Sequence, residues 1–538
     1  MKNIIKQPLR IITGGILGLS LILWNVSCED YLEDELLSDT SVDFLYTTPE
    51  GLESAVVGLY TINRNLYEQT WWNGAIPLIL QSKSDLAFGR GGEISLFSRL
   101  AWGAILDDTG TNGGYNFYWT HYYKLADRCN AIIKAAENLD GIDEDQRNTI
   151  IAEAKCMRAN SYFTLYRLFN NIFVTTEPTT PENAFEKPQD KSSEAEIFAL
   201  LNSDLEFAIN NLEMTTSDFG RWTQASARHL KAKVAVWENN WDEAAAQADA
   251  IISDGSYSLL GSTADVFQGD MNHSETLFAI QYQRDAVGGG GRNYMNWQTV
   301  ANYAIAPGMV YSLDNGGNGA GFVMLNDYVR GLLQEDPNDN RDDGTYYISY
   351  YTYNNVETLP EGAQVGDTLD LYDQYSSEQD EFTKYYRQMN PGVLKFLDET
   401  ADPSDRNHIS NIMIYRLAET YLIGAEAHLM SGNTGKALEY INAIRNRANA
   451  ASLTEIDIQD VLDERARELA FEGQRWFTLK RRGLLFQYLQ DHMGNDNYNQ
   501  TYGTGDPRTM IQEHMKNWPI PQSQIELLGP NYPQNDGY

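Results

Sequence analysis

Cysteine is scarce in this chain, and so is positive charge. The 538 residues include three cysteines, and 40 lysines and arginines face 75 aspartates and glutamates, giving a formal net charge of −35. A surface this acidic repels phosphate backbones, which argues against nucleic acid as a partner. It also lacks the basic clusters that attach peripheral proteins to anionic lipid. A chain of this length forms a core without disulfide support.

Long apolar runs are missing except near the N-terminus. Three basic residues precede a mostly apolar, uncharged stretch at 11–24, which then leads to Ser27 and Cys28. The stretch is shorter than the ~20 apolar residues of a transmembrane helix, and its form is that of a secretory signal. The residues before Cys28 resemble a bacterial lipobox. We predict a signal peptide at 1–27 and acylation of Cys28, which would anchor the protein to a membrane; the alternative is an ordinary signal peptide with a nearby cysteine.

The two remaining cysteines, Cys129 and Cys156, lie among apolar residues in segments with helical periodicity. Unpaired cysteine behaves as a small hydrophobic residue, so we expect two buried free thiols. A disulfide between them is the alternative, since an exported protein meets an oxidising compartment.

Signatures of catalysis and of metal binding are also missing. The sequence has no HExxH, GxSxG or GxxxxGK[ST] motif, and its seven histidines show no metal-ligand spacing. Residues 336–344 could offer oxygen ligands to calcium but lack the terminal glutamate of a calcium loop, which favours a solvated acidic turn. Carboxylate pairs that could hydrolyse a glycoside are inevitable among 75 acids and identify no site. We therefore expect no cofactor and no metal.

One short basic run, at 480–482, follows three glutamates, Glu464, Glu468 and Glu472. It is too short to bind nucleic acid in so acidic a chain. Helical spacing favours ion pairs between this run and these glutamates.

Helical periodicity dominates the rest of the chain. Helices are expected from Thr48, from about Phe117, and at 145–169, 192–212, 224–239, 241–253, 415–431 and 434–448. Small residues in the last four segments let paired helices approach closely, as in tetratricopeptide-type repeats. The predicted fold class is mainly α: an irregular superhelix of tetratricopeptide-like helix pairs with long loop-rich insertions and few short strands.

Two irregular insertions, at about 71–116 and 262–407, interrupt the helices and are rich in glycine, aspartate and aromatic residues. Loops of this length in a compact protein are usually functional. We interpret residues 28–40 as an acidic tether. Residues 41–538 are predicted to form one domain that carries both insertions.

The C-terminal third contains an ordered series of motifs. They are the runs at 415–427, 437–448 and 464–477, then Trp518-Pro519-Ile520-Pro521, and the C-terminal residues 534–538. With the acidic start after Cys28, this series resembles the SusD/RagB family of outer-membrane nutrient-binding lipoproteins. Two positions depart from the family pattern: Asn338 stands where arginine is usual, and Asp536 stands where proline is usual.

The resemblance implies a mostly helical fold built on four tetratricopeptide-like units. It implies a lipid-anchored protein on the outer face of the outer membrane, which caps a SusC-like TonB-dependent transporter and captures glycans without cleaving them. A peptide-binding lid of a peptide transporter is a second hypothesis. A surface glycosidase is a third.

The family motifs lie in the scaffold, so the ligand-binding residues are predicted from physical chemistry. A sugar has an apolar face, which aromatic rings cover, and a hydroxyl rim, which carboxylate, amide and guanidinium groups bind. Both insertions supply this mixture. The candidates are Asp85, Arg90 and Trp102 in the first insertion, and Arg292, Tyr294, Asn296, Trp297, Tyr303 and Phe322 in the second.

Overall fold

A computed structural model describes the greater part of the chain. The described residues are 42–68, 76–89, 114–188, 190–284, 286, 288–291, 293–342, 344–369, 391–494, 508 and 511–538. Helices dominate, and the strands are short and joined in pairs. The predicted fold class is therefore confirmed. Among the helices of the described ranges, none combines the length and apolar character needed to cross a membrane.

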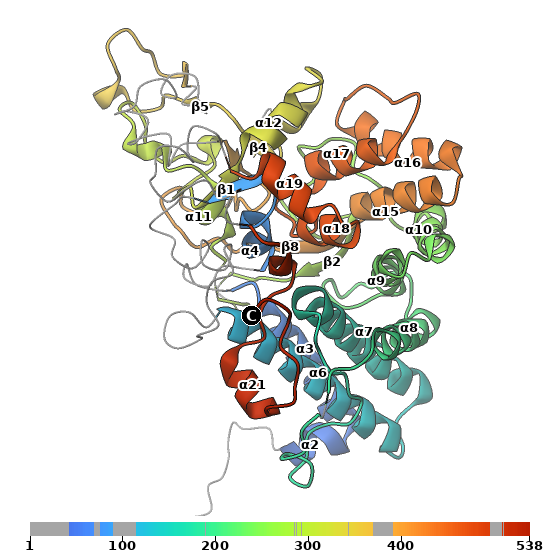
Figure 1. Ribbon diagram of the computed structural model, residues 1–538. Coiled ribbons are helices and arrows are strands. Elements are labelled where there is room, and N and C mark those ends of the chain that lie inside the picture. The colour runs from blue at the N-terminus through green and yellow to red at the C-terminus, as the bar shows by residue number, and fades with distance from the viewer. Residues whose placement is uncertain are drawn as a thin grey trace, which may run out of the picture.

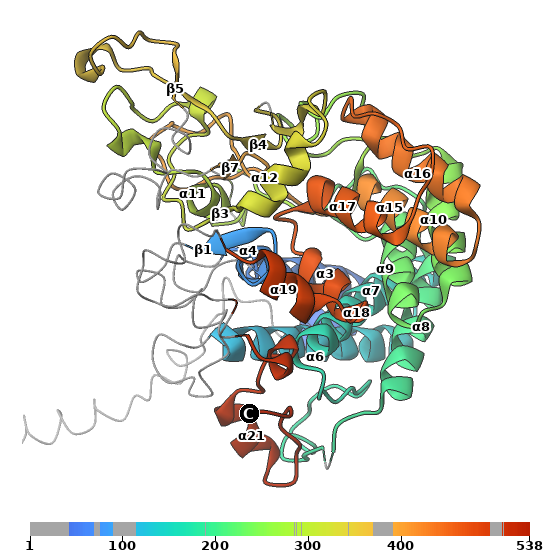
Figure 2. The ribbon, with the colours of Figure 1, turned by 45° about the horizontal axis from the view of Figure 1, so that its top comes forward.

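A curved stack of helices forms the scaffold (Figures 1 and 2). In chain order its members are α2 (Val42–Thr47), α3 (Pro49–Arg64), α6 (Gly114–Asn138), α7 (Glu144–Phe169), α8 (Glu194–Asn211), α9 (Gln224–Trp237), α10 (Trp241–Asp254), α15 (Leu417–Met430), α16 (Thr434–Arg447) and α17 (Ile458–Leu469). From α6 to α16, each helix packs against the next in this order. The predicted helices all exist, and their ends differ from the predicted ones by at most three residues.

Local capping explains where these helices begin. Thr48 accepts a hydrogen bond from Gly51 N at the start of α3, and Ser193 forms a capping box at the start of α8. Asn240 and Asn433 cap α10 and α16 in the same way. Each cap satisfies a backbone N–H that the helix itself leaves unpaired. The two turns expected between paired helices are therefore encoded by these asparagines.

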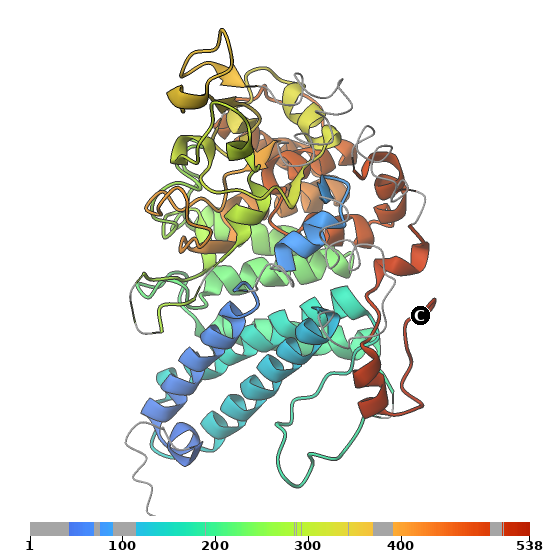
Figure 3. The same ribbon diagram turned by 90° about the vertical axis from the view of Figure 1, so that its left-hand side faces the viewer.

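The second insertion leaves the stack and returns to it at one place. Strand β2 (Thr276–Ile280) pairs antiparallel with β8 (Ile412–Arg416), and α10 packs directly on α15 although residues 255–416 lie between them. Gly424 permits this approach, because a Cβ there would lie 2.8 Å from the Tyr440 ring and 3.2 Å from Ala248. The insertion thus projects from an uninterrupted stack, at the end of the molecule opposite α2 (Figures 1 and 3).

Short elements organise both insertions, which are less irregular than expected. They are α4 (Ile76–Ser82), β1 (Ala87–Gly89), α11 (Met295–Thr299), β3 (Val323–Leu325), α12 (Asp327–Gln334), β4 (Tyr347–Ile348), β5 (Tyr351–Thr352), β6 (Thr368–Leu369) and β7 (Gly392–Val393). The second insertion has its own small core, where the rings of Tyr303 and Tyr351 stack 5.1 Å apart. The C-terminal part adds α18 (Arg475–Arg481), α19 (Leu485–His492) and α21 (Gln522–Leu528).

The prediction that residues 480–482 pair with the nearby glutamates is wrong. Arg481 pairs with Glu426, and Lys480 donates to the carbonyl of Arg167. The reason is a break in the helix: Phe471 and Gly473 have positive φ angles of 70° and 77°, so α17 and α18 are separate helices. The three glutamates instead face buried cations from elsewhere in the chain.

The cysteine prediction is confirmed, since Cys129 and Cys156 are buried and free. The acidic turn is only partly solvated: Asp336 is partly exposed, but the Asp339 side chain is buried against Arg341. Within the described ranges, no group of three or more acidic, histidine or cysteine side chains is arranged to hold a metal ion.

Candidate ligand-binding face

Three aromatic residues predicted from the second insertion come together around α11. The Trp297 ring lies 5.0 Å from the Phe322 ring at an interplanar angle of 79°, and 6.1 Å from the Tyr294 ring at 64°. These are edge-to-face contacts of the kind that aromatic pairs favour. Trp297 is only 7% exposed, whereas Tyr294 and Phe322 are partly exposed. Trp297 therefore supports the face, and its two neighbours offer accessible ring surface.

Arg406 joins this cluster, although the sequence did not identify it. Its guanidinium carbon lies 5.4 Å from the centre of the Trp297 ring, and the side chain is exposed. Within the described part of the chain, Arg406 forms no ion pair. A guanidinium over an aromatic ring gains a cation–π contact and keeps its donors free for hydroxyl groups. We name Tyr294, Trp297, Phe322 and Arg406 the aromatic face.

A glycine-rich turn at 316–321 places Phe322 against Trp297. Backbone N–H groups of Ala320 and Phe322 donate to the carbonyls of Trp297 and Gln298, at 2.7 and 2.8 Å. A Cβ on Gly319 would lie 2.2 Å from the Ala301 carbonyl oxygen, so no larger residue fits there without a shift. The turn therefore depends on glycine for close backbone approach to α11.

Asn296 and Tyr303, both predicted as ligand residues, lie behind this turn and are fully buried. Asn296 Nδ2 donates to the Gly316 carbonyl at 2.9 Å, and the Tyr303 hydroxyl donates to the Gly317 carbonyl at 2.8 Å. Burial raises the pKa of Tyr303. Both side chains hold the turn from inside and do not reach a ligand surface.

Hydrogen bonds from Asn318 and Asn293 hold the loop at 398–408, which carries Arg406. Asn318 donates to the Ser404 carbonyl at 2.7 Å, and His408 exchanges two backbone hydrogen bonds with Asn293, each 3.1 Å. His408 Nδ1 accepts from the backbone N–H of Asp398 at 3.0 Å. Burial lowers the pKa of His408 to about 4, so the ring is neutral in the folded protein.

The acidic residues of this loop accept hydrogen bonds from their own neighbours. Asp402 accepts from Ser404, and Asp405 accepts from Asn407. Burial raises the pKa of Asp398, but hydrogen bonds from Thr400 and Ile409 outweigh it and lower the pKa overall. These hydrogen bonds fix the shape of the loop that presents Arg406.

Asp85, predicted from the first insertion, is in the core. Its carboxylate is fully buried and accepts hydrogen bonds from Arg475 Nη2 at 2.6 Å and Nε at 3.0 Å. This ion pair joins the end of α4 to α18. The structure thus gives Asp85 a structural partner, and its carboxylate is not available to a ligand.

The two insertions nevertheless meet beside the aromatic face. Strand β1 pairs antiparallel with β3, and Gly89 lies opposite Val323, the neighbour of Phe322. Arg90 follows Gly89 directly in sequence. Arg90, Trp102, Arg292 and Cys28 lie outside the described residues, so their roles stay predictions.

Two hollows lie on the scaffold, and residues between 272 and 279, at the start of the second insertion, line the smaller one. One of about 560 Å³ is lined by α3, α7 and the segment after α8, and the other of about 280 Å³ lies next to it. The lining of the larger hollow includes five carboxylates, and Arg221 pairs with Glu53 and Glu153 among them. Its lining differs from the aromatic face, which combines aromatic rings with the Arg406 guanidinium.

Comparison with known proteins identifies the family. The model of the SusD family matches residues 274–538, a match that covers the second insertion and the C-terminal helices. The chain belongs to the SusD/RagB family. The resemblance noted in the sequence is thereby confirmed.

Individual relatives are similar over most of their length. SusD-like protein P25 of Formosa agariphila is 26% identical over 95% of this chain and 96% of its own. Starch-binding protein SusD of Bacteroides thetaiotaomicron is 23% identical over 72% of each chain. The solved structure of surface glycan-binding protein A from Bacteroides fluxus has 24% identity and a TM-score of 0.69, covering 91% of this chain and all of that one.

Proposed function

We propose that this protein is a cell-surface lipoprotein that binds oligo- or polysaccharide and delivers it to a SusC-like TonB-dependent transporter. The observation that carries the proposal is the aromatic face, where Tyr294 and Phe322 flank Trp297 and Arg406 lies over its ring. Ring surface suits the apolar side of a sugar, and the guanidinium suits its hydroxyl rim. The relatives named for starch or glycan binding support the same ligand class.

Anchoring and transport belong to the same proposal. Acylation of Cys28 and an acidic tether at 28–40 would hold the folded domain, which starts near Val42, at the outer face of the outer membrane. A surface protein of this kind increases the local concentration of glycan at its transporter.

The chemistry of the face supports binding without cleavage. Glycoside hydrolysis needs a carboxylic acid with a raised pKa beside a second carboxylate. Two acids of the loop that carries Arg406 have the opposite property: hydrogen bonds from Ser404 lower the pKa of Asp402, and the pKa of Asp398 is also lowered. Both carboxylates remain ionised, and both accept hydrogen bonds from residues of their own loop.

A panel of neutral and acidic polysaccharides tests the proposal. The purified protein should migrate more slowly in native gels that contain one of these glycans than in gels without it. It should release no reducing sugar from that glycan. Binding to a peptide pool with no glycan would establish the peptide hypothesis instead. Release of reducing sugar would establish a glycosidase and overturn the binding-only function.

A further inference from the structure

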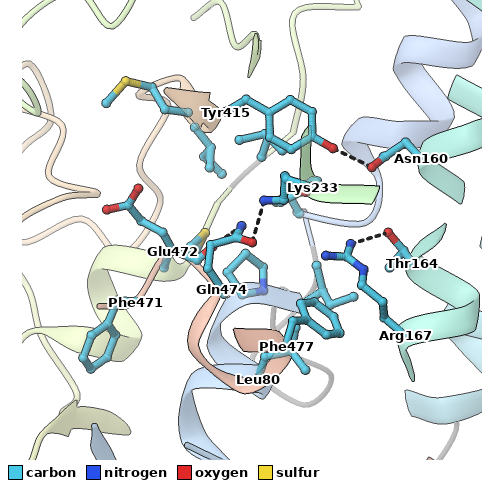
Figure 4. Close-up of a pocket in the computed structure, with 18 of the residues that line it drawn as sticks. Leu80, Asn160, Thr164, Arg167, Lys233, Tyr415, Phe471, Glu472, Gln474 and Phe477 are labelled. Atoms are coloured by element: carbon cyan, nitrogen blue, oxygen red, sulfur yellow. Dashed lines mark hydrogen bonds between the residues drawn. The ribbon is translucent and has the colours of Figure 1, made fainter. Parts of the chain in front are cut away.

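A small cavity of about 60 Å³ lies where the helical scaffold meets the base of the second insertion. Its lining comes mainly from α4, α6, α7, α9, β8 and residues 471–477, with Met295 of α11 (Figure 4). A water needs about 15 Å³ of such space, so a few water-sized groups fit and a sugar ring does not. The cavity is therefore separate in size and place from the proposed glycan face.

The wall of this cavity contains a buried guanidinium, Arg167, that has no acidic partner among the residues the structure describes. Arg167 of α7 is 6% exposed and is sandwiched between the rings of Phe163 and Phe477, at 4.1 and 4.0 Å. It donates to the Phe163 carbonyl and the Thr164 hydroxyl, which are neutral acceptors. Within the described ranges no carboxylate lies within ion-pair distance of it. Buried charges in proteins are otherwise paired, because desolvation costs several kcal/mol.

A second cation faces the same space. Lys233 of α9 lines the cavity and donates to Gln474 at 2.7 Å (Figure 4). It also donates to Glu419 at 2.8 Å. Glu419 also pairs with Arg465 at 3.4 Å, so one negative charge is shared between two cations, Lys233 and Arg465. Burial lowers the pKa of Lys233 to about 8, and the charges of Arg167 and Arg465 act in the same direction.

A third cation lies behind the cavity, whereas the one carboxylate of its lining, Glu472, is paired with Lys395 and Arg416. Lys480 donates to the carbonyl of Arg167, and burial together with the charges of Lys516 and Arg167 lowers its pKa to about 7. Cation–π contacts with two rings stabilise Arg167 only in part, because they do not neutralise its charge. A negative charge inside the cavity would compensate Arg167 and reduce its repulsion of both lysines.

We propose that this cavity binds one small monovalent anion, of the size of a halide or formate, held by Arg167 and Thr164 with Lys233 opposite. Such an anion would join α7 to α9 in the interior of the scaffold. A ligand that binds only the folded state stabilises it by mass action.

Thermal unfolding tests the site. At constant pH and ionic strength, replacing gluconate by chloride should raise the unfolding midpoint saturably, by about 2 °C or more. Arg167→Met should lose this response. Arg128→Met, at an exposed arginine of α6, should keep it.

Crystals soaked in bromide give a second readout that does not depend on a folded variant. An anomalous peak is expected beside Arg167 and Thr164. Equal midpoints in chloride and gluconate for the unmodified protein, or no bromide peak at Arg167, would overturn the proposal. A chloride response that persists in Arg167→Met would place the anion elsewhere and also overturn it.

Discussion

Arg416 Nη1 donates a 2.6 Å hydrogen bond to Glu468 Oε1 in the interior, and this pair joins the end of β8 to α17. Arg447 of α16 and Arg341 of the second insertion also pair with Glu468. Burial raises the pKa of Glu468, but the surrounding arginines outweigh it and hold the pKa well below its usual range. One carboxylate thus connects the scaffold to the insertion.

Glu468→Gln should be strongly destabilising, because it leaves three buried guanidinium groups without their shared partner. Removing one member of a buried ion pair costs about 3–5 kcal/mol. Urea unfolding measures this loss. The control is Glu439→Gln, which breaks the exposed pair with Lys436 and should cost less than about 1 kcal/mol. Similar losses in both variants would contradict the role given to Glu468.

His408 should make the loop at 398–408 sensitive to acid. A histidine whose pKa is lowered on folding, here to about 4, binds a proton more readily when unfolded. Its stability contribution is complete above the unfolded pKa of about 6.5 and is lost as the pH falls from there toward 4. Unfolding midpoints at pH 7 and pH 5 should therefore fall more in the unmodified protein than in His408→Gln. Equal falls would show that His408 is not the responsible group.

Gly319→Ala should damage the aromatic face without touching an aromatic residue. The added Cβ would lie 2.2 Å from the Ala301 carbonyl oxygen and 2.3 Å from that of Val300, which forces the turn away from α11. Both the unfolding midpoint and glycan affinity should decrease. Gly331→Ala is the matched control in α12, where a Cβ meets nothing within 4 Å, and it should stabilise by about 0.4–1 kcal/mol. Retained glycan affinity in Gly319→Ala would contradict this account of the turn.

Arg406→Ala should weaken glycan binding with no loss of stability, because the side chain is exposed and its guanidinium has no ion pair in the described part of the chain. Arg406→Lys should restore only part of the affinity, since an ammonium cannot present the planar donor fork. Isothermal titration calorimetry with the recognised glycan measures the affinities of the unmodified protein, Arg406→Ala and Arg406→Lys. Equal affinity in all three would remove Arg406 from the site.

The sequence predicted the scaffold well because helical periodicity and asparagine caps are local signals. Tyr294, Trp297 and Phe322 are candidates because aromatic residues in a polar insertion stand out; the structure brings the three together, and their role in binding stays a prediction. The sequence does not reveal that Asp85 is buried in an ion pair, because its partner Arg475 lies on α18, far along the chain. Arg406 could not be identified from the sequence for the same kind of reason, since only the folded loop at 398–408 brings it to Trp297.

The most direct test measures glycan affinity after the double substitution Tyr294→Ala with Phe322→Ala, which removes the accessible ring surface and keeps the supporting Trp297. Phe185→Ala, at a ring that is 91% exposed and far along the chain from the insertion, is the control. Titration against the glycan selected by the panel should show at least about a tenfold loss for the double variant and no change for the control. Unchanged affinity in a folded double variant would contradict the claim that the aromatic face binds the glycan.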